Sequence, residues 1–156
     1  MFELTIPGYK KLLLSYIVLD YNGTVSCDGR LITGVKDLLE ELSQSFAIHI
    51  LTADTYGNVQ KELSGVPCEV VVIGKGDEAR AKTDYLRQLE AQKTVCVGNG
   101  RNDALMLKEA ALGIAVIQEE GCAVETLLAA DIVTRNILDA LDLLRHPLRL
   151  TATLRS

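Results

Sequence analysis

Short apolar runs alternate along the chain with longer segments in which apolar residues recur at helical spacing. The runs are rich in Val and Ile and mostly lack alternation of apolar and polar residues, which is typical of strands buried on both faces. They predict strands at Leu13–Leu19, Phe46–Leu51, Glu69–Ile73, Thr94–Val97, Gly113–Ile117 and Asp131–Val133. The segments with helical spacing predict helices at Val35–Ser43, Asn58–Leu63, Glu78–Gln92, Asp103–Ala110, Ala123–Ala129 and Ile137–Leu144. This alternation predicts an α/β protein, with a Rossmann-like, doubly wound, mostly parallel sheet in a three-layer α/β/α arrangement.

Three segments lie outside this pattern. Phe2–Ile6 is a candidate for an additional edge strand. Val25–Ile32 contains Asp28–Gly29, which is a strong signal for a tight hairpin between two short segments. The tail from Pro147 to Ser156 receives no assignment from its pattern. Because no linker rich in Pro, Gly or Ser interrupts the alternation, we expect one domain over residues 1–156.

The net charge of −5 and the scatter of the basic residues predict no binding to nucleic acid or to an anionic membrane surface. The most basic local cluster, Arg145, His146 and Arg149, is interpreted as part of a solvated tail. No apolar stretch approaches the roughly 20 residues of a membrane span, and the N-terminus lacks the basic-then-apolar build of a signal peptide. We therefore expect a soluble, cytoplasmic protein.

The four cysteines, Cys27, Cys68, Cys96 and Cys122, lie far apart and form no C-x-x-C pair. This spacing argues against a metal or redox motif. We expect free, buried thiols, as in a reducing compartment.

In a sheet of this kind, ligands bind beyond the carboxyl ends of the strands. The positions that follow the apolar runs are Asp20, Thr52, Gly74–Lys75 and Gly98–Asp103. Taken singly, these positions have structural interpretations: Asn22–Gly23 is a common hairpin turn, and Thr52 is a suitable helix cap. The segment Gly98–Asp103 is not a dinucleotide fingerprint, because G-x-G-x-x-G would need Gly in place of Asp103, and Gly74-Lys75-Gly76 fails the same test.

Three of these segments, in their order along the chain, resemble motifs of the haloacid-dehalogenase (HAD) superfamily, and in particular of the phosphorylation domain of P-type ATPases. D-Y-N-G-T at Asp20–Thr24 is similar to the nucleophile motif. L-T-A-D at Leu51–Asp54 is similar to the L-T-G-D of the pumps, and G-N-G-R-N-D at Gly98–Asp103 to their G-D-G-x-N-D. The resemblance extends from about Tyr16 to Leu144. Three ordered motifs at strand ends are far more specific than any one of them.

The resemblance implies a Mg²⁺-dependent phosphohydrolase in which Asp20 is the catalytic nucleophile and forms an aspartyl-phosphate. A carboxylate attacks an anionic phosphate ester only when a cation cancels the charge between them. Hard cations of this kind prefer oxygen ligands. The metal ligands that the resemblance implies are Asp20, Asn22, Asp103 and Asn99, with Asn22 contributing its backbone carbonyl.

The phosphoryl oxygens need hydrogen-bond donors. The family pattern implies the hydroxyl of Thr52, a lysine ammonium, and backbone N–H groups near Gly23 and Ala53. Lys82, near the start of a predicted helix, is the favoured lysine, because an ammonium on a rigid helix is better oriented than one on a glycine-flanked loop. Lys75, which follows a predicted strand, is the alternative.

Two amides stand where the family carries acids. HAD phosphatases have a second Asp two residues after the nucleophile as general acid and base, and here that position is Asn22. Asn99 likewise replaces the first acid of the last motif. An amide cannot transfer a proton at neutral pH. The replacements predict a slow or specialised phosphohydrolase, and they leave open a catalytically silent HAD-like binding or regulatory domain.

Asp20, Thr52 and Lys82 follow one another at intervals of about 30 residues, which leaves no room for a cap domain. The chain thus resembles capless HAD phosphatases, such as the 3-deoxy-octulosonate 8-phosphate enzyme, in which a flap hairpin and neighbouring subunits close the site. Val25–Ile32 is the predicted flap. We expect a phosphorylated small molecule or a phosphoprotein as substrate, and a homo-oligomer as the assembly.

Overall fold

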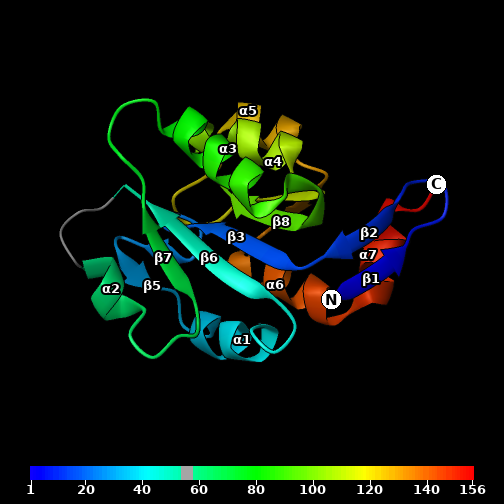
Figure 1. Cartoon of the computed structure of the whole chain (residues 1–156), viewed down its shortest axis with the longest axis horizontal. Helices are drawn as coiled ribbons and strands as arrows, with labels where there is room; N and C mark the ends of the chain where they lie inside the picture. The colour runs from blue at the N-terminus through cyan, green and yellow to red at the C-terminus, as the bar shows by residue number, and fades with distance from the viewer. Residues whose placement is uncertain (54–57) are drawn as a thin grey trace.

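A sheet of six parallel strands forms the centre of the protein (Figure 1). The computed structural model describes residues 1–53 and 58–156. In spatial order the strands are β10 (Ile132–Thr134), β9 (Leu112–Val116), β8 (Thr94–Gly98), β3 (Tyr16–Asp20), β6 (Ala47–Thr52) and β7 (Glu69–Val72). Every neighbouring pair in this sheet is parallel. The predicted Rossmann-like sheet is therefore confirmed.

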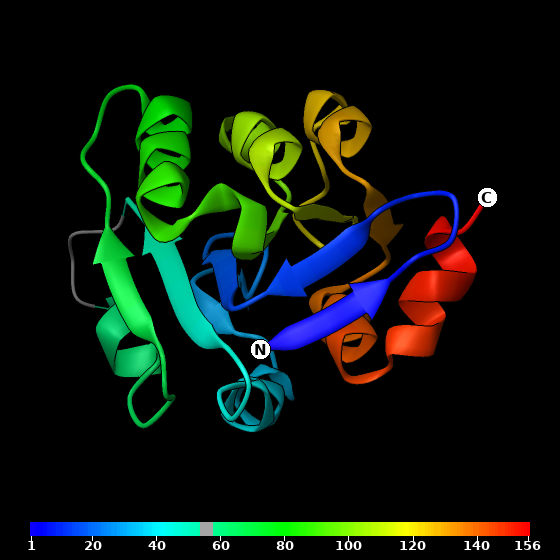
Figure 2. The ribbon, with the colours of Figure 1, turned by 45° about the vertical axis from the view of Figure 1, so that its right-hand side comes forward.

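Helices cover both faces of this sheet (Figures 1 and 2). One layer contains α3 (Glu78–Leu89), α4 (Ala104–Glu109) and α5 (Val124–Ala129), and the other contains α1 (Val35–Leu42), α2 (Asn58–Glu62) and α6 (Ile137–Arg145). Strand β3 shows why both layers form. Val18 packs in one apolar cluster with Leu86 of α3, whereas Ile17 and Leu19 pack in the other with Leu39 of α1. A strand that is apolar on both faces needs a helical layer on each side.

The N-terminal segment forms a hairpin outside the main sheet. β1 (Phe2–Thr5) pairs antiparallel with β2 (Lys11–Leu14) in a separate two-stranded sheet. The prediction of one strand over Leu13–Leu19 is wrong, because the ladder breaks at Ser15, between β2 and β3. The candidate edge strand Phe2–Ile6 does exist, but it pairs with β2 and not with the main sheet.

The C-terminal segment, which had no predicted element, is helical. α7 (Pro147–Leu154) begins with proline, whose missing N–H costs nothing in the first turn of a helix. Leu150 is fully buried in the core and fixes the helix there. The basic cluster is also not a free tail, because Arg145 and Arg149 both form ion pairs with Asp142 of α6.

Two 3-10 turns shorten the predicted helices. α3 ends at Leu89 because Glu90 adopts a left-handed conformation with a φ of 80°, and η1 (Ala91–Lys93) follows it. η2 (Arg101–Asp103) precedes α4, so the predicted helix that starts at Asp103 begins one residue later. Among the described residues, no helix combines the length and apolar character that a membrane crossing requires.

The predicted flap follows β3 at its carboxyl end. β4 (Ser26–Cys27) pairs antiparallel with β5 (Arg30–Leu31). Asp28 and Gly29 between them have φ angles of 51° and 80°, and a two-residue hairpin turn of this type needs such positive values. Along residues 1–53 and 58–156, no further domain is inserted at this edge of the sheet.

Candidate active site

Two carboxylates and one ammonium meet at the carboxyl ends of β3 and β8. Asp20 is the last residue of β3, and Asp103 ends the turn η2 that follows β8. The Nζ atom of Lys82, from α3, lies 2.7 Å from Oδ1 of Asp20 and 2.7 Å from Oδ1 of Asp103. The exposed fractions of Asp20, Asp103 and Lys82 are 7%, 0% and 1%. The three charges are thus withdrawn from water, and the two carboxylates share one partner.

The three groups do not balance in charge. Burial, and then the neighbouring carboxylate of Asp103, raise the pKa of Asp20 to about 7, although Lys82 and Thr24 act in the opposite direction. Burial opposes the charge of Lys82 as well, but Asp20 and Asp103 outweigh this effect and raise the pKa of its ammonium above the ordinary value. An additional cation beside these carboxylates would favour the ionised form of Asp20.

Asp103 is held by the glycine loop that precedes it. Its Oδ2 atom accepts hydrogen bonds from the backbone N–H groups of Asn99, at 3.1 Å, and Gly100, at 2.9 Å. A Cβ atom at Gly98 would lie 2.5 Å from Cγ of Asp103. Glycine at this position is therefore required by the close approach of the carboxylate to the backbone.

Asn99 bridges two loops of the site. The hydroxyl of Thr24 lies 3.0 Å from Oδ2 of Asp20 and 3.2 Å from Oδ1 of Asn99. The Nδ2 atom of Asn99 donates to the carbonyl of Gly121 at 3.0 Å. A carboxylate at this position would bring an oxygen against that carbonyl, so the amide suits its surroundings. Its side chain is engaged at both ends, and its role as a metal ligand stays a prediction.

Asn22 and Gly23 lie between β3 and the flap. Asn22 is exposed and lines a cavity beside the flap. The N–H of Gly23, near which we predicted phosphate donors, donates to the carbonyl of Ser26 at 3.0 Å. With a φ of 79°, and with Nδ2 of Asn99 only 2.5 Å from where a Cβ atom would stand, only glycine fits here. The backbone N–H of Gly23 is thus engaged in a hydrogen bond within the turn.

The other predicted phosphate ligands lie at the end of β6. Thr52 is buried at the last position of β6, whose Leu51 stands opposite Asp20 in the sheet. Ala53 follows it and is partly buried. Asp54, which completes the L-T-A-D segment, lies outside the described residues. The sheet therefore places Thr52 next to the strand that carries Asp20.

The two candidate lysines lie in different environments. Lys82 is buried and contacts both carboxylates, and its Nζ atom also donates to Oδ1 of Asn102 at 3.1 Å. Lys75 is exposed in the loop between β7 and α3, and among the described residues it forms no ion pair. The structure brings Lys82 to Asp20 and leaves Lys75 at the surface.

Sequence reasoning missed Gln118, which holds the backbone of the loop that follows Asp20. Its Nε2 atom donates to the carbonyls of Gly23, at 2.8 Å, and Thr24, at 2.6 Å, and its Oε1 atom accepts from the N–H of Ile137 at 3.0 Å. Gln118 directly follows the predicted strand Gly113–Ile117, at the edge where ligand-binding residues are expected. This position after a predicted strand is the feature of the sequence that could have identified Gln118.

Gln118→Met should lower the free energy of unfolding by about 1–3 kcal/mol, because two loop carbonyls and one helix N–H lose their partner. Chemical denaturation with urea would measure this loss. Gln88→Met, on the exposed face of α3, is the matched control and should change stability by less than about 0.5 kcal/mol. Equal effects of the two substitutions would contradict a bracing role for Gln118.

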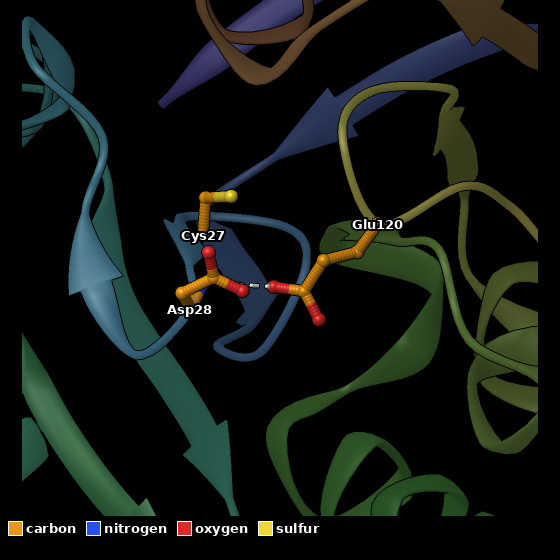
Figure 3. A group of neighbouring side chains, drawn as sticks. All are labelled: Cys27, Asp28 and Glu120. Carbon is orange, nitrogen blue, oxygen red and sulfur yellow. Dashed lines mark hydrogen bonds between the residues drawn. The ribbon is translucent and has the colours of Figure 1, made fainter.

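A second group of possible metal ligands joins the flap to the loop after β9. Ligand atoms of Cys27, Asp28 and Glu120 lie within 4.8 Å of one another (Figure 3). The backbone N–H of Asp28 donates to Oε2 of Glu120 at 3.2 Å, and this bond accounts for the approach of the two segments.

Cys96 is the one fully buried thiol among the four cysteines, and the other three are partly exposed, contrary to our expectation.

Solved structures of HAD phosphatases share this fold. The 3-deoxy-D-manno-octulosonate 8-phosphate phosphatase of Moraxella catarrhalis superposes with a TM-score of 0.69, at 18% identity, over 84% of this chain and 85% of that one. The corresponding phosphatase of Haemophilus influenzae gives a TM-score of 0.72, at 12% identity, over 92% of this chain and 94% of that one. The HAD-like fold that the motifs implied is therefore confirmed.

Two archaeal proteins are related in sequence, whereas no protein-family model matches the chain. The uncharacterized protein MJ0073 of Methanocaldococcus jannaschii is 48% identical over 84 residues, which make up 51% of this chain and 90% of the relative. The uncharacterized protein MJ0072 of the same organism is 49% identical over 39 residues, 25% of this chain and 89% of the relative. The chain belongs to the family of these archaeal proteins, and it has the fold of the HAD phosphatases.

Proposed function

We propose that this protein is a Mg²⁺-dependent phosphohydrolase that acts through an aspartyl-phosphate on Asp20. The observation that carries the proposal is the buried group in which Asp20 and Asp103 share the ammonium of Lys82. Burying two carboxylates with one counter-charge is unfavourable for stability. Strongly perturbed acids at the ligand-binding edge of a sheet are typical of functional sites.

The residues present fit a magnesium ion. The donors are hard carboxylate oxygens with an excess of negative charge, and each oxygen has a second lone pair beside the one already engaged. Asp20 and Asp103 would hold the ion, and the backbone carbonyl of Asn22 is the further ligand that the family resemblance implies. A bound Mg²⁺ would cancel the repulsion between the carboxylate and the phosphate ester. The Moraxella phosphatase was crystallised in complex with magnesium, phosphate and KDO, which supports this choice.

Separate side chains have separate roles in the proposed reaction. The carboxylate of Asp20 forms a bond to phosphorus while the bond from phosphorus to the leaving oxygen breaks. Lys82 and Thr24 hold that carboxylate from two sides and keep it oriented. The buried Thr52 and the ammonium of Lys82 are the proposed donors to the phosphoryl oxygens. Water then attacks the aspartyl-phosphate and releases inorganic phosphate.

The test is release of inorganic phosphate from a panel of phosphate esters with and without Mg²⁺. We expect activity that a chelator removes, and a drop in kcat/KM by a factor of about 10³ or more in Asp20→Asn, because the nucleophile is lost. Asp37→Asn, an exposed position on α1, is the matched control and should keep full activity.

The second candidate function is a catalytically silent binding domain. It is favoured by Asn22 and by the engaged amide of Asn99, which leave the site without its family acids. Its signature would be binding of Mg²⁺ and inorganic phosphate, seen by calorimetry, together with no Asp20-dependent release of phosphate from any ester. That outcome would replace the phosphohydrolase proposal.

A further inference from the structure

Glu78 reaches the buried ionic group through one intermediate side chain. It is the first residue of α3, one helical turn before Lys82. Its Oε2 atom accepts a hydrogen bond from Nδ2 of Asn102 at 2.6 Å, and Oδ1 of Asn102 accepts one from Nζ of Lys82 at 3.1 Å. A continuous path of hydrogen bonds therefore leads from Glu78 to the ammonium that Asp20 and Asp103 share.

The spacing of Glu78 and Lys82 is that of a surface ion pair on a helix, with the acid first. In the structure Lys82 is instead 1% exposed and pairs with Asp20 and Asp103. Asn102, which precedes Asp103 in η2, lies between the two residues of α3 and contacts both. Over residues 1–53 and 58–156, Asn102 is the one side chain that binds the carboxylate of Glu78.

The two ends of this path fix the orientation of the amide between them. An amide donates through its nitrogen and accepts through its oxygen, whereas a carboxylate only accepts hydrogen bonds and an ammonium only donates them. Asn102 satisfies both neighbours only when Nδ2 faces Glu78 and Oδ1 faces Lys82. Glu78 thus holds the amide at its other end and presents an acceptor to Lys82.

The three N–H groups of an ammonium are all engaged in Lys82. Two of its acceptors are the carboxylates of Asp20 and Asp103, each at 2.7 Å, and the third is the neutral Oδ1 of Asn102. In the proposed reaction the carboxylate of Asp20 gives up its negative charge as it bonds to phosphorus. Lys82 would then turn one N–H from Asp20 to a phosphoryl oxygen, while Asp103 and Asn102 keep the ammonium in place.

We infer that Glu78 is a positioning residue for Lys82 and acts through the amide of Asn102. The inference rests on the proposed function, in which Lys82 donates to the phosphoryl oxygens. The contact of Glu78 with Asn102 is short and has one ionised partner, so it belongs to the stronger class of hydrogen bonds. A donor that is already held in place needs no reorganisation when charge develops on the phosphoryl group.

Glu78→Met tests this role, because it removes the acceptor and keeps a side chain of similar length. We expect kcat/KM for a phosphate ester in the presence of Mg²⁺ to fall about tenfold, the value of one hydrogen bond to a charged group. Glu78→Gln still offers an oxygen to Nδ2 of Asn102 and should keep most of the activity. Glu40→Met, at an exposed position on α1, is the matched control and should keep full activity.

The comparison of the two Glu78 variants also excludes a simpler role. An acid in the first turn stabilises a helix through its dipole. Glu78→Gln and Glu78→Met both remove that charge, and glutamine and methionine have similar helix propensities. A role confined to the start of α3 predicts equal losses in the two variants. Equal losses, or full activity in Glu78→Met, would overturn the inference.

NMR of the metal-free protein separates this inference from the proposed function. The protons of a buried, hydrogen-bonded ammonium exchange slowly with water, so the N–H signal of Lys82 can be followed directly. Glu78→Met and Asn102→Leu should both shift or broaden this signal, whereas Glu78→Gln should leave it close to that of the unaltered protein. If no ester is hydrolysed, the proposed function fails, but the spectra still show whether Glu78 holds Lys82. An unchanged signal in Glu78→Met would show that it does not.

Discussion

Lys82→Met is expected to lower the free energy of unfolding by about 3–5 kcal/mol at neutral pH in metal-free buffer, because two buried carboxyl groups lose their shared counter-charge and Asp20 can avoid an unpaired charge only by binding a proton. Methionine preserves most of the side-chain volume, so the loss reports the missing ammonium and not a cavity. Lys82 is 1% exposed and contacts Asp20 and Asp103 at 2.7 Å each, so water cannot take over its role. Urea denaturation of the two proteins measures the difference.

Lys75→Met is the control for this experiment. It makes the same chemical change at an exposed position in the loop after β7, and it should alter stability by less than about 0.5 kcal/mol. Adding Asp20→Asn and Asp103→Asn to Lys82→Met removes the unpaired charges and should recover part of the loss. If Lys82→Met unfolds no more easily than Lys75→Met, the three side chains do not form the buried ionic group described above.

Asn22→Asp is expected to raise steady-state turnover by a factor of about 10² to 10⁴, the usual contribution of general acid–base catalysis. A carboxyl group at this position can give a proton to the leaving oxygen and later take one from the attacking water. Asn22 is exposed at the wall of the cavity, so the added charge needs no buried partner. The gain should be largest for alkyl phosphates, whose leaving groups need a proton, and smaller for nitrophenyl phosphate.

Rapid mixing distinguishes the two chemical steps. The unaltered protein should show a burst of leaving group followed by slow turnover, because its aspartyl-phosphate is hydrolysed without help, and Asn22→Asp should remove the burst. Asn58→Asp adds the same charge across the cavity and should not produce the increase in turnover. If turnover does not change in Asn22→Asp but is lost in Asp20→Asn, another group supplies the proton.

The sheet could be predicted because its strands are uninterrupted apolar runs, a pattern typical of strands buried on both faces. Ile17, Val18 and Leu19 are apolar without alternation, and in the structure they face both helical layers. The ends of the chain gave weaker signals. The break at Ser15 is set by how the N-terminal hairpin leaves the main sheet, a tertiary effect that local pattern does not contain. The helix α7 is short, and its one fully buried residue, Leu150, gives no period to detect.

The site was predictable where a motif coincides with a strand end. Asp20 ends β3 and Asp103 lies in the turn after β8, and the parallel pairing of β3 and β8 brings them together. Lys82 was a choice between two lysines. The folded chain places Lys82, and not Lys75, against Asp20 and Asp103, and its role toward phosphate stays a prediction. Gln118 was not found, because its partners are backbone carbonyls far along the chain, and a sequence motif does not display them.

The N-terminal hairpin and the C-terminal segment meet on the side of the molecule away from the site. The hairpin of β1 and β2 and the helix α7 lie together at one end, opposite the carboxyl ends of β3 and β6 (Figures 1 and 2). The N–H of Ser156 donates to the carbonyl of Pro7 at 3.2 Å and joins the two segments. A bead, a sensor surface or a fluorescent reporter attached at either terminus would therefore stand away from this edge, and immobilised protein should keep the edge that carries Asp20 and Asp103 open to solution.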